Sequence, residues 1–97
     1  MIVLTKGEKM IVHDILNKFV PTYKVFVFGS RAKGTKKPFA DLDLLISGDT
    51  PIPNLTVALL RDAFSESDLP FRVDLLDEKT TSSEFLAAID ADKIKVQ

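Results

Sequence analysis

Residues 23–47 read YKVFVFGSRAKGTKKPFADLDLLIS, two apolar segments separated by a polar connection. The aromatic and β-branched residues at 23–28 predict a strand that is buried on both faces, and residues 42–47 predict a second strand. The connection has about a dozen residues, which is near the lower limit for the crossover that joins parallel strands. We therefore expect an antiparallel pair, with the end of the first strand beside the start of the second.

Two aspartates lie at the start of the second strand, although aspartate is uncommon in strands. Asp41 and Asp43 are two positions apart, so both carboxylates point to the same face, with their Cα atoms about 6.5–7 Å apart. Two close negative charges repel each other and are costly to bury without a cation. Mg²⁺ suits them because it prefers hard oxygen ligands. The alternative is that both side chains face solvent as ordinary polar alternation on an exposed sheet face.

Gly29 and Ser30 end the first strand. Glycine leaves space for a close ligand, and residues 31–33 predict a single helical turn whose free N–H groups bind phosphate oxygens. Positive side chains follow at Arg31, Lys33, Lys36 and Lys37. Each feature alone fits a plain turn or a solvated loop. Together they predict a phosphate-binding loop beside the paired carboxylates.

A third carboxylate would complete a two-metal site, in which two ions about 3.5–4 Å apart stabilise the attacking and leaving oxygens of a displacement. Asp74 is the preferred candidate because it lies within a third predicted strand, over residues 71–76. Asp77 follows that strand and fits a cap or a surface position. The alternative for Asp74 is an ion pair with Arg72 on the same strand face.

The rest of the chain predicts three helices and a short edge strand over residues 93–97. Two capping boxes, Thr5 with Glu8 and Thr81 with Glu84, mark the starts of the first and third helices. The first helix is expected over residues 6–20 and the second over residues 54–66. We expect an α/β (α+β) fold, with one domain over residues 1–97 and a small mixed β-sheet with helices packed on one face.

Composition excludes several classes of protein. The chain has 97 residues, a formal net charge of -1 and an apolar fraction of 45%, which excludes a disordered chain and argues against direct nucleic-acid binding. The absence of cysteine excludes disulfide frameworks and thiolate metal sites. No apolar run is long enough for a signal peptide or a membrane span. We therefore expect a cytoplasmic protein with no membrane partner.

The order of these motifs is similar to a known pattern. Gly29-Ser30, ten intervening residues, Asp41-Leu42-Asp43-Leu44 and then Val73-Asp74-Leu75 together resemble the signature of the polymerase beta type nucleotidyltransferase superfamily. The short chain and the wording of residues 29–34 resemble its minimal branch, the MNT proteins. The resemblance covers nearly the whole chain.

That resemblance implies a site and a reaction. Asp41 and Asp43 would hold two Mg²⁺ ions, and Asp74 would complete the shell of the catalytic ion and help to activate the acceptor hydroxyl. Gly29 and Ser30 would bind the nucleoside triphosphate, with Arg31 assisting at the phosphates. The implied reaction is transfer of a nucleoside monophosphate, usually AMP from ATP, to a hydroxyl, with release of pyrophosphate.

The resemblance also implies a partner. MNT proteins are commonly paired with a separate helical HEPN partner, an RNase toxin, and act as its antitoxin. A hetero-oligomer that modifies the toxin is thus one expectation. Two alternatives stay open: a catalytically silent module that binds nucleotide and neutralises the toxin by occlusion, and a structural domain of a larger complex.

Overall fold

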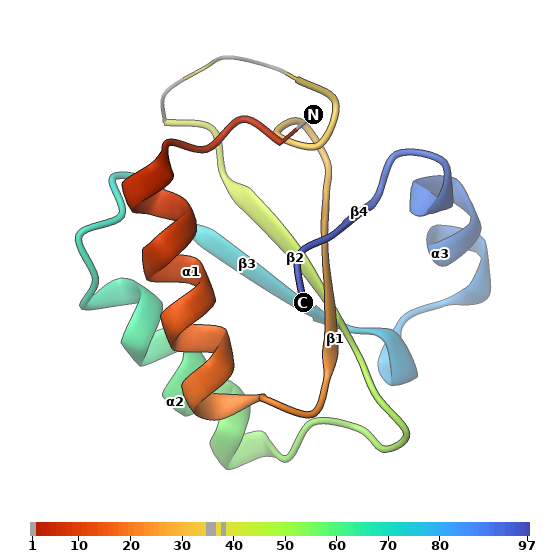
Figure 1. Cartoon of the computed structure of the whole chain (residues 1–97). Helices are drawn as coiled ribbons and strands as arrows, with labels where there is room; N and C mark the ends of the chain where they lie inside the picture. Colours follow the sequence, from red (N-terminus) through yellow and green to blue (C-terminus); the bar gives the residue numbers. More distant parts are fainter. Residues whose placement is uncertain (1, 35–36, 38) are drawn as a thin grey trace.

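A four-stranded mixed sheet forms the centre of the computed structural model, which describes residues 2–34, 37 and 39–97. The elements follow the chain in the order α1 (Lys6–Phe19), β1 (Lys24–Phe28), β2 (Leu42–Ser47), α2 (Asn54–Ser65), β3 (Val73–Asp77), η1 (Glu78–Thr80), α3 (Ser83–Asp90) and β4 (Ile94–Lys95). The strand order is β3-β2-β1-β4 (Figure 1). The predicted mixed sheet is confirmed.

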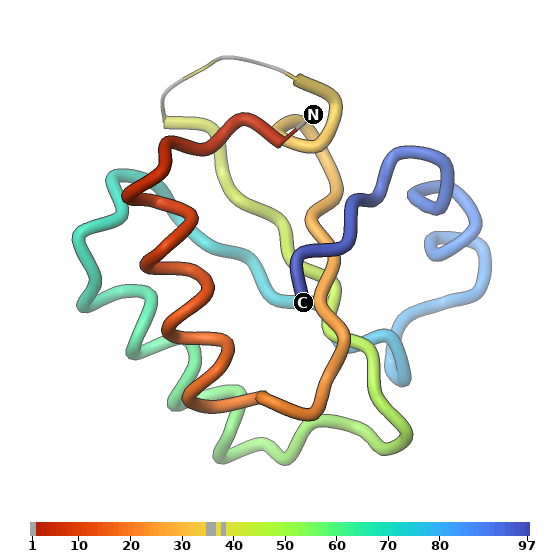
Figure 2. The backbone as a smooth tube through the Cα atoms, viewed as in Figure 1, coloured from red at the N-terminus to blue at the C-terminus, as the bar shows by residue number. Residues whose placement is uncertain are grey.

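The pairing of β1 with β2 is antiparallel, as the short connection predicts. Strand β2 pairs with β3 in parallel, and β4 pairs with β1 antiparallel. Strands β1 and β2 run side by side in opposite directions, so that Phe28 at the end of β1 lies opposite Asp43 near the start of β2 (Figure 2). The loop that carries Gly29 and Ser30 therefore adjoins the start of β2.

Helices α1 and α2 cover one face of the sheet (Figure 1). The alternate residues of β2 that face them, Leu42, Leu44 and Ile46, are fully buried. They pack with a cluster from both helices and β1, made of Val12, Leu16, Val25, Val27, Leu60 and Phe64. Because side chains alternate along a strand, Asp43 points to the opposite face.

Helix α3 lies beyond β4, away from the other two helices (Figure 1). Its Phe85 contacts Phe28 edge-to-face, with 5.9 Å between ring centroids. Phe28 shares the face of Asp43, so α3 forms one wall beside that residue. Helices α1 and α2 thus pack on one face as expected, whereas Phe85 of α3 contacts Phe28 on the opposite face.

The predicted capping box of Thr5 and Glu8 is confirmed, with both reciprocal hydrogen bonds present. The prediction for the third helix is wrong by one residue. Ser82 caps α3 by accepting from the Phe85 N–H, whereas the Thr81 hydroxyl donates to the Asp77 carbonyl oxygen at 2.6 Å. Strand β3 runs from Val73 to Asp77 rather than over residues 71–76, so Phe71 precedes it as a core residue and Asp77 is its last residue.

Candidate active site

Asp43 and Asp74 lie side by side on neighbouring strands. The parallel register of β2 and β3 pairs Asp43 with Asp74, and the antiparallel register pairs Asp43 with Phe28. Asp43 is half-buried and Asp74 is exposed. Asp41 is exposed and directly precedes β2. The topology therefore gathers the three predicted acids at the amino-terminal ends of β2 and β3.

The charges of these acids affect one another. The pKa of the Asp43 carboxyl is raised above its ordinary value, first because burial disfavours the charged form, then because of the negative charges of Asp74 and Asp41. Such a carboxylate gains stability from any cation that replaces the missing solvent. A cation bound at the site would therefore stabilise the charged form of Asp43.

Gly29 fits closely over Asp43. Its φ of 75° lies in the left-handed region, and a Cβ added there would collide with the Asp43 carboxylate. The predicted helical turn appears as a turn in which the Lys33 N–H donates to the Gly29 carbonyl oxygen at 3.2 Å. Ser30 is half-buried beside it. The loop and the carboxylates thus meet as the sequence predicts.

Arg31 is buried behind the Gly29–Ser30 turn. Only 3% of its surface is exposed, and its guanidinium donates to the carbonyl oxygens of Ala40 at 2.9 Å and Val3 at 2.7 Å. It also stacks over the Phe71 ring, 3.9 Å from the centroid. Arg31 therefore joins the amino-terminal segment, the loop and the core. Its predicted contact with phosphate stays a prediction.

Asp74 and Asp77, the two candidate acids of β3, have different partners. Arg72 forms the ion pair with Asp74 that the sequence suggested as an alternative, with 3.7 Å between Nη2 and Oδ1. Asp77 accepts from the main-chain N–H groups of Ile52 at 2.8 Å and Lys79 at 2.9 Å. Asp77 is thus a cap that anchors the segment before α2.

The cationic loop residues are only partly described. Lys33 is exposed and approaches Asp92 at 4.0 Å, and Lys37 is also exposed. Lys36 lies outside the described residues.

An open cavity of about 560 Å³ adjoins the two paired acids. Arg72 and Phe85 stand at its walls, and its lining continues over the edge strand β3. The lining residues are Phe28, Asp43, Arg61, Arg72, Val73, Asp74, Leu75, Leu76 and Phe85. Its size is within the range of small-molecule sites, about 300–1,000 Å³.

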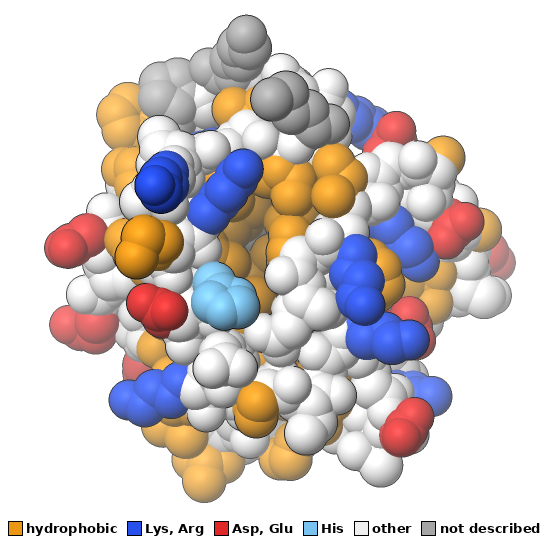
Figure 3. Space-filling model, in the orientation of Figure 1, with side chains coloured by type: hydrophobic (Ala, Val, Ile, Leu, Met, Phe, Trp, Pro, Cys, Tyr) orange, Lys and Arg blue, Asp and Glu red, His pale blue; other side chains and the backbone are white. Residues whose placement is uncertain are grey.

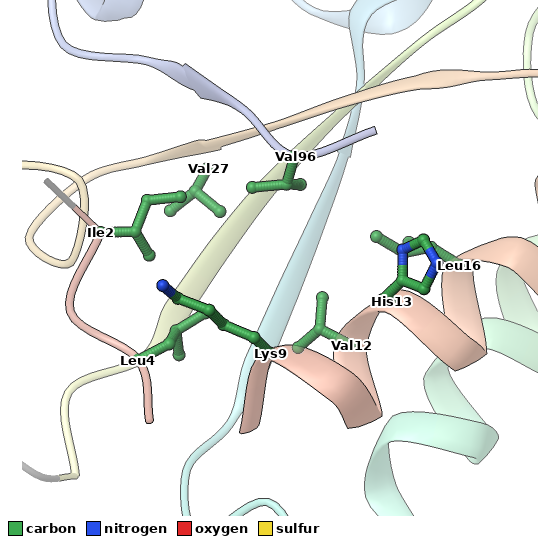
Figure 4. Close-up of a pocket in the computed structure, with 8 residues that line it drawn as sticks. All are labelled: Ile2, Leu4, Lys9, Val12, His13, Leu16, Val27 and Val96. Atoms are coloured by element: carbon green, nitrogen blue, oxygen red, sulfur yellow. The ribbon is translucent and has the colours of Figure 1, made fainter. Parts of the chain in front are cut away.

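A second cavity, of about 290 Å³, lies on the other face of the sheet, where Figure 3 shows an apolar hollow beside the histidine. Figure 4 shows Lys9 reaching over it from α1. Its described lining includes one histidine, His13, and no aspartate or glutamate, so it lacks the paired carboxylates of the first cavity. Its lining residues are Ile2, Leu4, Lys9, Val12, His13, Leu16, Val27 and Val96.

The acids can serve as ligands of a metal ion only together with other groups. In the part of the chain that the structure describes, no three acidic or histidine side chains form a group that could hold a metal ion by themselves. Mg²⁺ does not require such a group, because it is usually bound through one or two carboxylates together with waters and substrate phosphates. Asp43 and Asp74, with Asp41 nearby, supply hard oxygen ligands of that kind.

Comparison with known proteins assigns the family. The nucleotidyltransferase domain family matches residues 9–96. The chain belongs to this family. This nucleotidyltransferase is also 53% identical, over 81 residues, to the probable protein adenylyltransferase MntA of Haemophilus influenzae, covering 82% of this chain and 71% of that protein.

Solved structures share the fold of this nucleotidyltransferase. A toxin–antitoxin crystallised with AMP-PNP superposes with a TM-score of 0.77 at 20% identity, over 92% of this chain and 72% of that one. A tri-AMPylated HEPN toxin of Shewanella oneidensis in complex with its MNT antitoxin gives a TM-score of 0.69 at 18% identity, over 92% and 68%. At these identities the likeness concerns the fold.

No helix in the described residues of this nucleotidyltransferase has the length and apolar character needed to cross a membrane.

Proposed function

We propose that this nucleotidyltransferase transfers AMP from ATP to a hydroxyl group, with Mg²⁺ held by Asp41, Asp43 and Asp74. The observation that carries the proposal is the half-buried Asp43, which pairs in register with Asp74 and lies directly under Gly29. The raised pKa of Asp43 is the expected property of a carboxyl whose cation is supplied by a ligand. Burial of an acid inside a strand has no structural benefit on its own.

Each part of the site then has a task. The left-handed turn at Gly29 lets the main chain approach the acids, and Ser30 offers its hydroxyl and N–H to the triphosphate. Mg²⁺ held by Asp41, Asp43 and Asp74 would neutralise the phosphate charge. Asp74, the most exposed of the paired acids, faces the open cavity from which an acceptor hydroxyl can enter.

The reaction is a displacement at the α-phosphorus. The acceptor oxygen forms the new bond to phosphorus, the bond to the bridging oxygen of the β-phosphate breaks, and pyrophosphate leaves. The hydroxyl proton passes to the Asp74 carboxylate and then to solvent. Positioning and charge neutralisation supply the rate enhancement.

We further propose that the acceptor is a protein, a HEPN-type toxin paired with this chain. The relative of 53% identity is named a protein adenylyltransferase, and the solved structures of the same fold are toxin–antitoxin complexes. The open cavity beside Asp74 can admit a side-chain hydroxyl of a second protein.

The test is incubation with Mg²⁺ and ATP labelled at the α-phosphate, with and without a purified HEPN-type protein. We expect label on the partner, and none when the label is at the γ-phosphate. The double variant Asp41→Asn with Asp43→Asn should abolish labelling. If the double variant still neutralises the partner fully, neutralisation works by occlusion and the proposed catalytic role is wrong.

A further inference from the structure

Among the ion pairs of the described residues, the pair of Arg72 with Asp74 is the one that involves an acid of the site. This pair is long, at 3.7 Å, and both side chains are exposed, at 81% and 50%. An exposed pair of this kind contributes little to stability, about 0.2–1 kcal/mol. The contact is therefore easily broken when either partner finds a stronger one.

The main chain of Arg72 is held by a hydrogen bond, whereas its side chain is exposed and can change rotamer. Its carbonyl oxygen accepts from the Leu42 N–H at 2.9 Å, which ties its main chain to the start of β2 between Asp41 and Asp43. Its side chain lines the same cavity as Asp43 and Asp74. The guanidinium can therefore swing over the acids from a fixed point at the cavity wall.

Binding of a cation changes what Arg72 faces. Without a ligand, the guanidinium offsets part of the repulsion between Asp74 and Asp43. With a divalent ion at Asp74, the guanidinium is left beside a stronger positive charge and is repelled. The nearest new acceptors are then the oxygens of a bound triphosphate, which suit the planar fork of arginine.

We propose that Arg72 exchanges partners, pairing with Asp74 in the free protein and with a phosphate oxygen of the nucleotide once a divalent ion occupies Asp74. The inference rests on the proposed function and adds a residue to it. Arg72 thereby competes with the metal when nucleotide is absent and favours the triphosphate when the metal is present.

The exchange predicts effects of opposite sign in one variant. Arg72→Gln removes the competing cation, so Mn²⁺ alone should bind about two- to fivefold more tightly. The same variant loses a charged hydrogen bond to phosphate, so a non-hydrolysable ATP analogue with Mg²⁺ should bind about tenfold or more weakly. Arg72→Lys keeps the charge and should fall between the wild type and Arg72→Gln in both measurements.

The experiment measures Mn²⁺ affinity by electron paramagnetic resonance and analogue affinity by calorimetry. Arg61→Gln is the matched control, because Arg61 lines the same cavity without an ion pair to these acids. Arg61→Gln should leave Mn²⁺ affinity unchanged. If Arg72→Gln weakens both affinities, or changes neither, partner exchange is wrong. Wild-type Mn²⁺ affinity in Asp43→Asn would instead overturn the proposed function itself.

Discussion

Substitution of Arg31 decides whether this residue supports the fold or binds phosphate. Arg31 is buried and donates to the carbonyl oxygens of Val3 and Ala40, while its guanidinium covers the Phe71 ring. Methionine has a similar length and can keep the contact with Phe71, but it donates no hydrogen bond. Arg31→Met therefore removes the two charged hydrogen bonds and leaves the local packing nearly filled.

The expected loss is large for a domain of this size. Each hydrogen bond from a charged donor contributes about 1.5–3 kcal/mol, so the two together give a loss of about 3–6 kcal/mol. The total stability of a domain this long is about 5–15 kcal/mol. The variant should therefore be marginally folded, with its melting temperature lowered by at least about 12 °C.

Urea unfolding measures the loss, with Arg31→Lys as the companion variant. Lysine keeps the positive charge but cannot reach both carbonyl oxygens with a fork, so we expect about half the destabilisation. The affinity for an ATP analogue is measured on the same samples under folding conditions. Arg31→Met within about 1 kcal/mol of the wild type, but with its analogue affinity lost, would refute the structural role and support the phosphate contact.

Three other substitutions give distinct results. Asp43→Asn should abolish nucleotidyl transfer and raise the melting temperature at neutral pH. Because the pKa of Asp43 is raised in the folded protein, wild-type stability falls as the pH rises from the ordinary carboxyl pKa through the raised one. A stability difference between the two proteins that is constant with pH would contradict this. Gly29→Ala should lower stability by about 1–2 kcal/mol through its backbone conformation alone and should also displace the Asp43 carboxylate. Gly34→Ala should show only the backbone cost, because Gly34 has a φ of 89° and no described atom lies within 4 Å of the added Cβ. Equal activities of the two variants would contradict the close fit at Gly29. Asp77→Ala should lower stability by about 1–3 kcal/mol with transfer per folded molecule retained, since Asp77 caps main-chain N–H groups; loss of transfer in a folded Asp77→Ala protein would assign it to the site instead.

Local patterns in the sequence were enough to predict most of the sheet. The length of the connection after β1 predicts the antiparallel pair, and the apolar residues at 23–28 and 42–47 predict its two strands. The position of Asp43 beside Gly29 follows from that pairing, because β1 and β2 are neighbours in the sequence. The parallel register of β3, which sets Asp74 next to Asp43, needs the packing of α2 as well.

The role of Arg31 was not predictable in the same way. Its partners Val3 and Phe71 are far from it in sequence, so no local pattern signals that the side chain is buried. An arginine after a Gly-Ser turn resembles a phosphate ligand whether it faces solvent or the core. The cap of α3 was missed for a related reason: Thr81 and Ser82 are equally suitable, and the Asp77 carbonyl oxygen engages Thr81.

The central claim is that the acids of β2 and β3 bind divalent ions that in turn hold a triphosphate under the Gly29–Ser30 turn. It is tested most directly by counting the Mn²⁺ ions bound per chain in the presence of a non-hydrolysable ATP analogue, for the wild type and for Asp43→Asn. Two ions in the wild type are predicted, with the loss of at least one ion and of most analogue affinity in the variant. Analogue binding that needs no metal and is unchanged by Asp43→Asn would contradict the account.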